Sequence, residues 1–235
     1  MLLSVIIPCF DEEAAAARFE TELFQALEAL GVPFEVIAVD DGSYDGTGGV
    51  LRNLAGERRN FKAKAHEYNR GLGQALRTGF ASASGDWIAT LDADLTFHPS
   101  QLRLLLDRQR ETGADMVCGS PFLDPAGTAQ VPWWRRLPSL AVNGLYRRLC
   151  GPALTAYTPI FRLYRAEALR SLRLESTGFE INAEIAARFL AAGLRVAEVP
   201  AVLTVRREGS SKLSPLRELW RHFRLGVRLS RSSQS

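Results

Sequence analysis

Short apolar runs alternate with amphipathic stretches along the first 120 residues of the chain. The runs predict strands because they are short and end at Gly, Pro, Asp or Ser residues. Between them, apolar residues recur at helical spacing, most clearly over residues 15–30, where the stretch ends at Gly31. The predicted strands cover residues 5–8, 34–39, 61–66, 87–91 and 115–118.

This alternation of strand and helix predicts an α/β fold, in which a Rossmann-like, mainly parallel sheet is flanked by helices on both faces. Later in the chain we expect helices over 133–149, 179–192 and 214–229, and strands over 160–164 and 195–199. The pattern contains no internal repeat and no linker. We therefore expect one domain over residues 1–213, with an amphipathic basic helix and tail, 214–235, packed on it or extending from it.

The composition is that of an ordinary globular protein, with 46% hydrophobic and 23% charged residues among 235. The three cysteines, Cys9, Cys118 and Cys150, lack C-x-x-C spacing, which favours a reducing cytoplasm. The chain opens on a predicted core strand instead of a signal peptide, and no apolar run approaches the ~18 residues that cross a bilayer. We expect a protein that is soluble or attached to a membrane surface.

Basic residues are concentrated in two segments, although the net charge is only +3. Residues 133–150 hold four arginines and no acid, and residues 206–231 hold eight basic residues against two glutamates. An acidic body with two basic segments indicates an anionic partner such as phosphate, anionic lipid or nucleic acid.

Acidic clusters follow three of the predicted strands, at residues 10–13, 40–43 and 92–94. The carboxyl ends of parallel strands meet at one edge of a sheet, so these clusters are expected to converge there. Asp92 and Asp94, one residue apart, suit a hard divalent cation such as Mg²⁺ or Mn²⁺. Taken alone, the tripeptide also fits a solvated turn or a helix N-cap.

Four ordered motifs carry a family resemblance: VIIPCFDE (5–12), VDDGSYDGT (39–47), NRGLG (69–73) and LDAD (91–94). Together they resemble family 2 glycosyltransferases of the GT-A fold, and most closely the polyprenol-phosphate sugar synthases, the group of dolichyl-phosphate mannose synthase. The segments FRLYR, GFE and RREGSSKL further along support that group, and the resemblance covers nearly the whole chain. It implies a nucleotide-sugar donor of the GDP-mannose or UDP-glucose type, a divalent cation, and transfer with inversion onto a polyprenyl or dolichyl phosphate.

The resemblance also implies roles for single residues. Asp92 and Asp94 would hold the metal and the diphosphate, with Ala93 and Thr96 beside them, and Arg206 and Lys212 would approach the phosphates from a flexible loop. A physical reason supports these roles, because a cation and an Arg fork stabilise the charge that develops on a departing diphosphate. The residues expected at the nucleoside are Pro8, Phe10, Glu12, Val39 and Asp41.

A phosphate acceptor is already an anion, so it needs no strong general base. This fits the absence of an obvious catalytic histidine, and we expect His66, His98 and His222 to be structural residues without an orienting partner. On the acceptor side the candidates are Arg162, Glu180 and Glu184. The two glutamates are i,i+4 neighbours that fit a solvated helix face equally well.

The segments Trp133–Cys150 and 214–229 mix Trp, Leu and Arg, as interfacial helices do. They predict peripheral contact with the cytoplasmic face of a membrane, without a transmembrane extension; the alternative is that both apolar stripes pack on the sheet. Leu225 and Leu229 fall outside the stripe and indicate a second contact, such as another subunit.

Three positions depart from the family pattern: Thr96 replaces a frequent Gln, Pro121 a frequent basic residue, and residues 155–160 an acidic, Ser-Gly-containing run. These changes lie on the sugar and acceptor side, so they bear more on the identity of the acceptor than on nucleotide binding. One alternative is transfer to a saccharide or small-molecule hydroxyl, which would need Glu180 or Glu184 as a base. Another is a protein that binds a nucleotide sugar without turnover. Nucleic acid is not an expected partner, because no recognition motif accompanies the basic segment.

Overall fold

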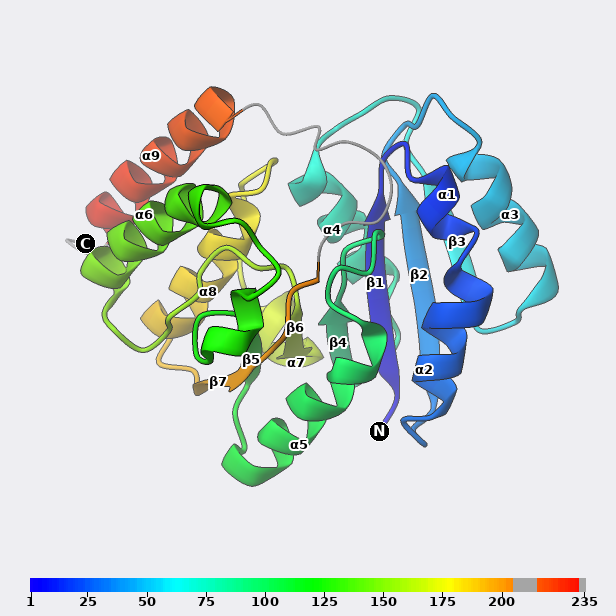
Figure 1. The fold of residues 1–235 in the computed structure, drawn as a ribbon, viewed down its shortest axis with the longest axis horizontal. Helices are drawn as coiled ribbons and strands as arrows, with labels where there is room; N and C mark the ends of the chain where they lie inside the picture. Colours follow the sequence, from blue (N-terminus) through cyan, green and yellow to red (C-terminus); the bar gives the residue numbers. More distant parts are fainter. Residues whose placement is uncertain (205–214, 233–235) are drawn as a thin grey trace.

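The structure is a computed structural model of the chain that describes residues 1–204 and 215–232. Within these residues, seven strands form one sheet in the order β3-β2-β1-β4-β6-β5-β7 (Figure 1). Every neighbouring pair is parallel except the two made by β6. The predicted α/β fold with a mainly parallel sheet is therefore confirmed. The strands are β1 Leu3–Cys9, β2 Phe34–Asp40, β3 Phe61–Ala65, β4 Trp87–Thr90, β5 Met116–Ser120, β6 Arg162–Arg165 and β7 Val196–Pro200.

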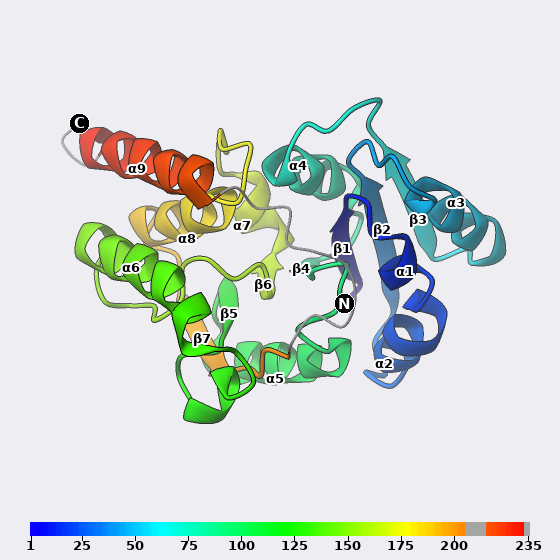
Figure 2. The same ribbon diagram turned by 45° about the horizontal axis from the view of Figure 1, so that its top comes forward.

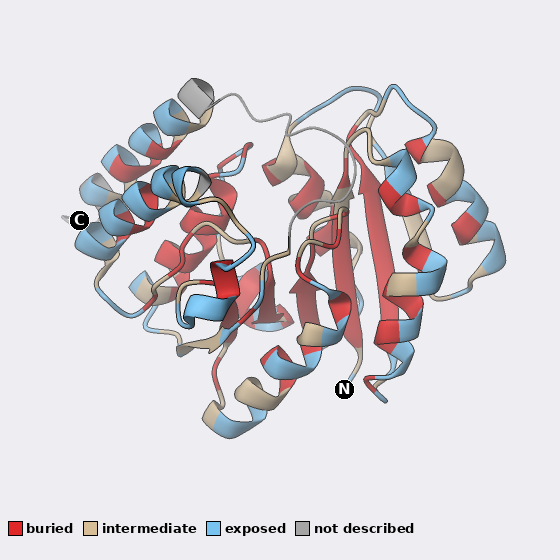
Figure 3. Ribbon diagram, viewed as in Figure 1, coloured by how far each residue is buried: buried red, intermediate tan, exposed pale blue. Residues whose placement is uncertain are grey.

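The central strands are apolar on both faces because helices cover both sides of the sheet. In β1, Val5 and Ile7 pack into one hydrophobic cluster while Ile6 packs into the other. This alternation is the two-residue period of a strand, and full burial on both faces explains why the runs read as continuously apolar. Figure 3 displays the buried sheet between partly exposed helices. The α-helices of five or more residues are α3 Thr47–Glu57, α4 Leu72–Ser82, α5 Leu102–Thr112, α6 Trp133–Cys150, α7 Ala166–Arg170, α8 Ile181–Ala191 and α9 Pro215–Ser232.

The single helix expected over residues 15–30 is wrong in detail. A π-helical segment, Phe19–Phe24, separates the short helices α1 Glu13–Ala16 and α2 Gln25–Glu28. Within the π-helical segment, Phe19, Leu23 and Phe24 are fully buried. The predicted apolar face is nevertheless the buried one.

Helices α6, α8 and α9 lie together on the side of the molecule away from β2 and β3 (Figures 1 and 2). Helix α9 packs inward through Leu225, which is 1% exposed and belongs to the same cluster as Tyr146 of α6 and Ile185 of α8. The second contact expected of Leu225 is therefore made within the chain. In the described part of the chain, no helix combines the length and apolarity needed to span a bilayer.

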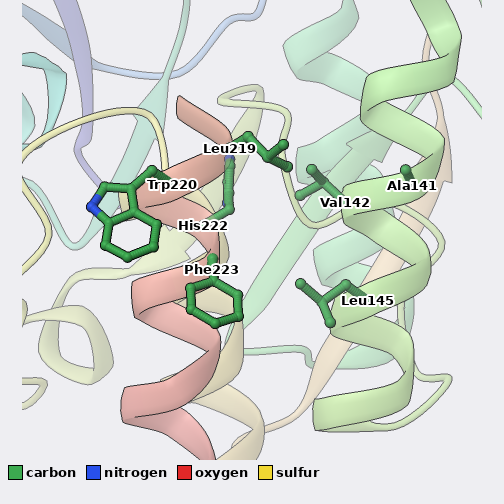
Figure 4. Close-up of a pocket in the computed structure, with 7 residues that line it drawn as sticks. All are labelled: Ala141, Val142, Leu145, Leu219, Trp220, His222 and Phe223. Atoms are coloured by element: carbon green, nitrogen blue, oxygen red, sulfur yellow. The ribbon is translucent and has the colours of Figure 1, made fainter. Parts of the chain in front are cut away.

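A large apolar surface stays uncovered on α6 and α9, so the alternative that both stripes pack on the sheet is wrong for most of their side chains. Between the two helices runs a groove of about 460 Å³, in which Leu219 and Phe223 of α9 face Val142 and Leu145 of α6 (Figure 4). We call this the α6–α9 surface. Its exposed members are Trp133, Trp134, Leu137, Leu140, Leu145, Leu149, Leu219, Trp220, Phe223 and Val227.

Candidate active site

The loops that follow β1 and β2 are tied to each other by hydrogen bonds. The Asp11 N–H donates to Ser43 Oγ (2.9 Å), the Glu12 N–H donates to Thr47 Oγ1 (2.8 Å), and the Tyr44 N–H donates to the Asp11 carboxylate (2.7 Å). These bonds hold Asp11 at a φ of 49°, which is unusual for a residue other than glycine. The first two acidic clusters thus meet at one edge of the sheet, as predicted.

The residues expected at the nucleoside gather at this edge. Pro8 lies opposite Val39 in the β1–β2 register, and the Phe10 ring lies edge-on to the Tyr44 ring with 6.2 Å between centroids. Val39 is fully buried, whereas Pro8, Phe10 and Glu12 are partly exposed. Their binding role stays a prediction.

Asp41 organises the corner between β2, β3 and α4. Its side chain is only 5% exposed, and the carboxylate accepts hydrogen bonds from His66 Nδ1 (2.6 Å) and from the N–H groups of Arg70 (2.9 Å) and Gly71 (2.7 Å). The other ring nitrogen of His66 lies 2.9 Å from Thr78 Oγ1. Asp41 therefore fixes the loop that enters α4, and three of its acceptor positions are used within the protein.

The expectation that the three histidines lack orienting partners is wrong. His66 is fixed by Asp41 and Thr78, His98 bonds to Ser100, and the buried His222 lies 3.0 Å from Tyr146 Oη. Burial lowers the pKa of His222. A signal for His66 was present in the sequence, because residues just past the ends of neighbouring parallel strands lie side by side, and Asp40 pairs with Ala65.

The acidic pair follows β4 in a segment whose burial alternates. Leu91, Ala93, Leu95 and Phe97 are buried, whereas Asp92, Asp94 and Thr96 are partly exposed. A two-residue period places both carboxylates on the exposed side. Leu95 has a φ of 55°, and the Thr96 N–H donates to Asp94 Oδ1 (3.0 Å), so the pair is held in a defined turn.

Two further elements border the acidic pair. Arg18, in the helical segment after β1, directs Nη2 at the main-chain oxygen of Asp94 (3.4 Å). On the other side, the Thr96 carbonyl accepts hydrogen bonds from both the N–H and the hydroxyl of Thr204 (2.9 Å each). The chain then enters residues 205–214, so Arg206 and Lys212 lie outside the described residues.

The side chains of the acidic pair fit a hard divalent cation as ligands. Asp92 and Asp94 offer carboxylate oxygens, the ligands that Mg²⁺ and Mn²⁺ prefer. Among the described residues, no cluster of three or more His, Cys, Asp or Glu side chains could hold a metal ion. Beside a substrate diphosphate, Mg²⁺ is commonly held by one or two carboxylates together with phosphate oxygens and water, and the acidic pair fits that kind of site.

The candidates for the acceptor side are buried. Arg162 is fully buried and donates to the carbonyl oxygens of Tyr157 and Asn182. Glu184 is also fully buried; burial raises its pKa, but hydrogen bonds from Ser176 and Arg188 outweigh this effect and the pKa is lowered. Glu180, 5% exposed, accepts from main-chain N–H groups of the preceding loop. The alternative of a solvated face is therefore wrong, and an acceptor role for these residues stays a prediction.

The segment around residue 155, which differs from the family pattern, is anchored by Glu198 of β7. The Glu198 carboxylate accepts hydrogen bonds from the N–H groups of Thr155 (2.7 Å) and Ala156 (3.0 Å). Burial raises the pKa of Glu198 in spite of these bonds. Pro121 also differs from the family pattern, and the hydroxyl of the preceding Ser120 bonds to the Thr155 hydroxyl (2.7 Å).

Comparison with known proteins gives one family and several relatives. The family described as Glycosyl transferase family 2 matches residues 4–173. An undecaprenyl-phosphate 4-deoxy-4-formamido-L-arabinose transferase from Pseudomonas paraeruginosa is 35% identical over 223 residues, which are 93% of this chain and 62% of the relative. The corresponding Edwardsiella ictaluri protein is 32% identical over 215 residues, 89% of this chain and 62% of the relative. The chain thus spans less than two thirds of these relatives.

Solved structures support the fold. The crystal structure of glucosyl-3-phosphoglycerate synthase from Mycobacterium tuberculosis, in complex with Mn²⁺ and uridine-diphosphate-glucose, superimposes with a TM-score of 0.69. It is 21% identical and the match covers 96% of this chain and 76% of that one. At this level of identity the likeness concerns the fold alone.

Proposed function

This chain belongs to glycosyl transferase family 2, and we propose that it transfers a sugar, with inversion, from a nucleotide-sugar donor to a polyprenyl phosphate. The observation that carries the proposal is the 35% identity, over 93% of this chain, to a transferase named for undecaprenyl phosphate. The acidic pair at the carboxyl edge of the sheet supports it, because a diphosphate donor needs a cationic partner at such an edge.

The proposed chemistry is the cleavage of a bond between sugar and phosphate. The departing nucleoside diphosphate gains charge, and groups that stabilise this charge in the transition state accelerate the reaction. Asp92 and Asp94 would hold Mg²⁺ or Mn²⁺, which supplies Lewis-acid stabilisation of the leaving group when bound. Arg206 and Lys212 are proposed to meet the same phosphates.

The chain's own residues are proposed to position the donor. Pro8, Phe10 and Glu12 line the edge on which a nucleoside would rest, and the buried Asp41 keeps the turn around it rigid. Thr96, beside the acidic pair, is shorter than the Gln common in the family. We therefore propose that it meets a phosphate or the ion through water.

The acceptor is proposed to attack without a strong general base, because a phosphate monoester is already anionic at neutral pH. This agrees with the histidines, each of which is engaged in a hydrogen bond within the protein. The carboxylates of Glu180 and Glu184 likewise serve main-chain N–H groups. A hydroxyl acceptor would need a base, and the candidate among the described residues is Glu180 Oε2, which is buried and makes no hydrogen bond with them.

A transfer assay with paired acceptors tests the proposal. UDP- and GDP-sugars are offered with Mn²⁺ or Mg²⁺ to undecaprenyl phosphate, and separately to the matching free prenol and to simple saccharides. We expect product only with the lipid phosphate, and none after chelation of the metal. Transfer to a hydroxyl acceptor alone, or donor binding without turnover under every condition, would contradict the proposal.

We also propose that the α6–α9 surface contacts the cytoplasmic face of an anionic bilayer, where such an acceptor resides. Trp133 is 62% exposed, and Leu219 and Trp220 are each 59% exposed. The surface is flanked by exposed arginines, among them Arg147 and Arg224, whose charge complements anionic lipid. A patch of Trp and Leu bordered by arginines has the chemistry of an interfacial helix pair.

Vesicle sedimentation tests this contact. We expect binding to vesicles that contain phosphatidylglycerol, reduced at high salt because exposed charges are screened. A W220S/F223S variant should lose at least about tenfold in partitioning, since each buried aromatic side chain contributes about 1.5–3 kcal/mol. The control is L104S on α5, where the leucine is 42% exposed. Failure to bind at low salt, or dimerisation through this surface in its place, would contradict the proposed membrane contact.

A further inference from the structure

Residues 174–178 form a loop that three helices hold at once. From α4, Arg77 Nη1 donates to the carbonyl oxygens of Leu174 (3.2 Å) and Ser176 (2.7 Å). From α8, the buried Glu184 carboxylate accepts from the N–H groups of Glu175 (3.1 Å) and Ser176 (2.7 Å). The third attachment comes from α9. We call this segment the 174–178 loop.

The loop is seated directly against the first turn of α4. The Gly73 N–H donates to the Thr177 carbonyl (2.8 Å). A Cβ at Gly73 would lie 2.3 Å from the Ser176 carbonyl oxygen, and one at Gly71 would lie 2.4 Å from that of Thr177. Glycine at both positions therefore permits a main-chain contact that any side chain would block. The Gly71 N–H donates to Asp41, at the corner between β2, β3 and α4 that we call the donor corner.

Two arginines of α9 lie against the loop: Arg221, whose Nη1 would lie 2.0 Å from a Cβ added at Gly178, and Arg228, which bonds to the loop directly. Arg228 Nη1 lies 3.1 Å from the Glu175 carboxylate, and Nη2 lies 3.0 Å from Ser176 Oγ. Arg228 and Glu175 are 42% and 40% exposed, so the pair is accessible and is not part of the core. A continuous series of bonded groups thus runs from α9 through the loop to α4 and Asp41.

We infer that the 174–178 loop links the membrane-facing helix α9 to the donor corner, and that Arg228 is the positioning residue of this link. The inference rests on the proposed function, because it joins the proposed membrane surface to the proposed donor site. When α9 lies on a bilayer, the loop is held against α4, and the donor corner is more ordered than in the protein free in solution. By linkage, donor binding then raises affinity for vesicles by the same factor that vesicles raise affinity for the donor.

Amide hydrogen exchange of the full chain tests the link without any donor. Wild type is compared with R228Q and with R224Q, which removes the same charge from the same helix. We expect R228Q to speed exchange in the 174–178 loop and at Gly73 by about two- to fivefold, the range for one exposed ion pair. R224Q should leave both regions unchanged. A charge-reversed pair, E175R/R228E, should restore slow exchange.

Vesicles supply the second readout. R224Q and R228Q each lose one charge next to the membrane surface, so they are compared with wild type at vesicle concentrations that saturate binding of each protein. Bound to vesicles containing phosphatidylglycerol, wild type and R224Q should show slower exchange of the loop and of Gly73, whereas bound R228Q should lack this protection. Equal behaviour of R228Q and R224Q, protection confined to α9, or no rescue by the reversed pair would overturn the inference. These readouts need no turnover, so a negative transfer assay with positive exchange results would reject the proposed function and leave the link standing.

Discussion

Asp94 is the single side chain on which the proposed activity depends most. Its Oδ1 accepts from the Thr96 N–H, a bond that Asn can also accept, so D94N should keep the turn. The lost negative charge should weaken cation binding and reduce kcat by at least about 100-fold. The measurement is transfer rate against Mn²⁺ concentration, together with thermal unfolding.

Asp124 offers a matched control for this substitution. Its Oδ1 accepts a hydrogen bond from the N–H of Ala126, two residues further along (2.8 Å). Asp94 accepts in the same way from Thr96. D124N should therefore match D94N in stability while keeping full activity. Equal activity losses in both variants, or full activity in D94N, would show that Asp94 does not hold the ion.

The sequence predicted single residues well where spacing alone decides their position. Asp92 and Asp94 share the exposed side because they are two residues apart in an alternating segment. His66 was missed because its partner, Asp41, lies 25 positions away and becomes a neighbour only through the β2–β3 register. The burial of Arg162, opposite Thr90 in the β4–β6 register, was not predictable from local pattern, and its role on the acceptor side stays a prediction.

At the level of elements, the close approach of α4 to the 174–178 loop predicts a sharp difference between two glycines. G73A should lower the free energy of unfolding by about 1–3 kcal/mol, because the new methyl group would overlap Ser176. A Cβ added at Gly49, within α3, would meet no atom within 4 Å, so G49A should raise this free energy by up to about 1 kcal/mol. Urea unfolding measures both; a stable G73A would mean that the loop does not sit as described.

Glu35 of β2 joins several elements and makes their stability depend on pH. Burial would raise its pKa, but hydrogen bonds from Lys62, Ser4 and Ser84 outweigh burial and lower the pKa from the ordinary 4.5 to about 2. The charged form is thus favoured in the folded state. Its contribution, about 2–3 kcal/mol, should be present above pH 4.5 and lost as the pH falls towards 2.

The variant E35Q separates this effect from general acid unfolding. Its free energy of unfolding at pH 7 should be lower than that of wild type, and its decline between about pH 5 and pH 2 should be shallower. The control is E57Q, which alters an exposed glutamate of α3. Parallel pH profiles for wild type and E35Q would rule out the assigned role of Glu35.

Elements were predictable where one period dominates the sequence. The seven strands were anticipated to within two residues at each end, because apolar runs flanked by turn residues have few other interpretations. The π-helical segment at Phe19–Phe24 was not, since a change of helical phase leaves the apolar spacing nearly intact. The antiparallel direction of β6 was also missed, because strand direction depends on long connections and not on local pattern.

At the level of the whole protein, two separate regions are connected through the 174–178 loop. One is the carboxyl edge of the sheet with its acidic clusters, which we call the acidic edge, and the other is the α6–α9 surface. The charge distribution in the sequence indicated both, an acidic body and two basic segments. It did not indicate their connection, which depends on residues 174–178 meeting three helices. The apolar stripe of α9 could be predicted from spacing, but its exposure could not, because a stripe looks alike whether it faces protein or lipid.

A crystal structure with Mn²⁺ and a nucleoside diphosphate, in which anomalous scattering locates the metal, would decide whether the acidic edge is the donor site. We predict a manganese peak coordinated by Asp94 with help from Asp92, and bridged to the diphosphate. The nucleoside should lie beside Pro8, Phe10 and Glu12. A metal and nucleotide bound elsewhere, with the acidic pair contacting neither, would contradict the proposed site and the mechanism built on it.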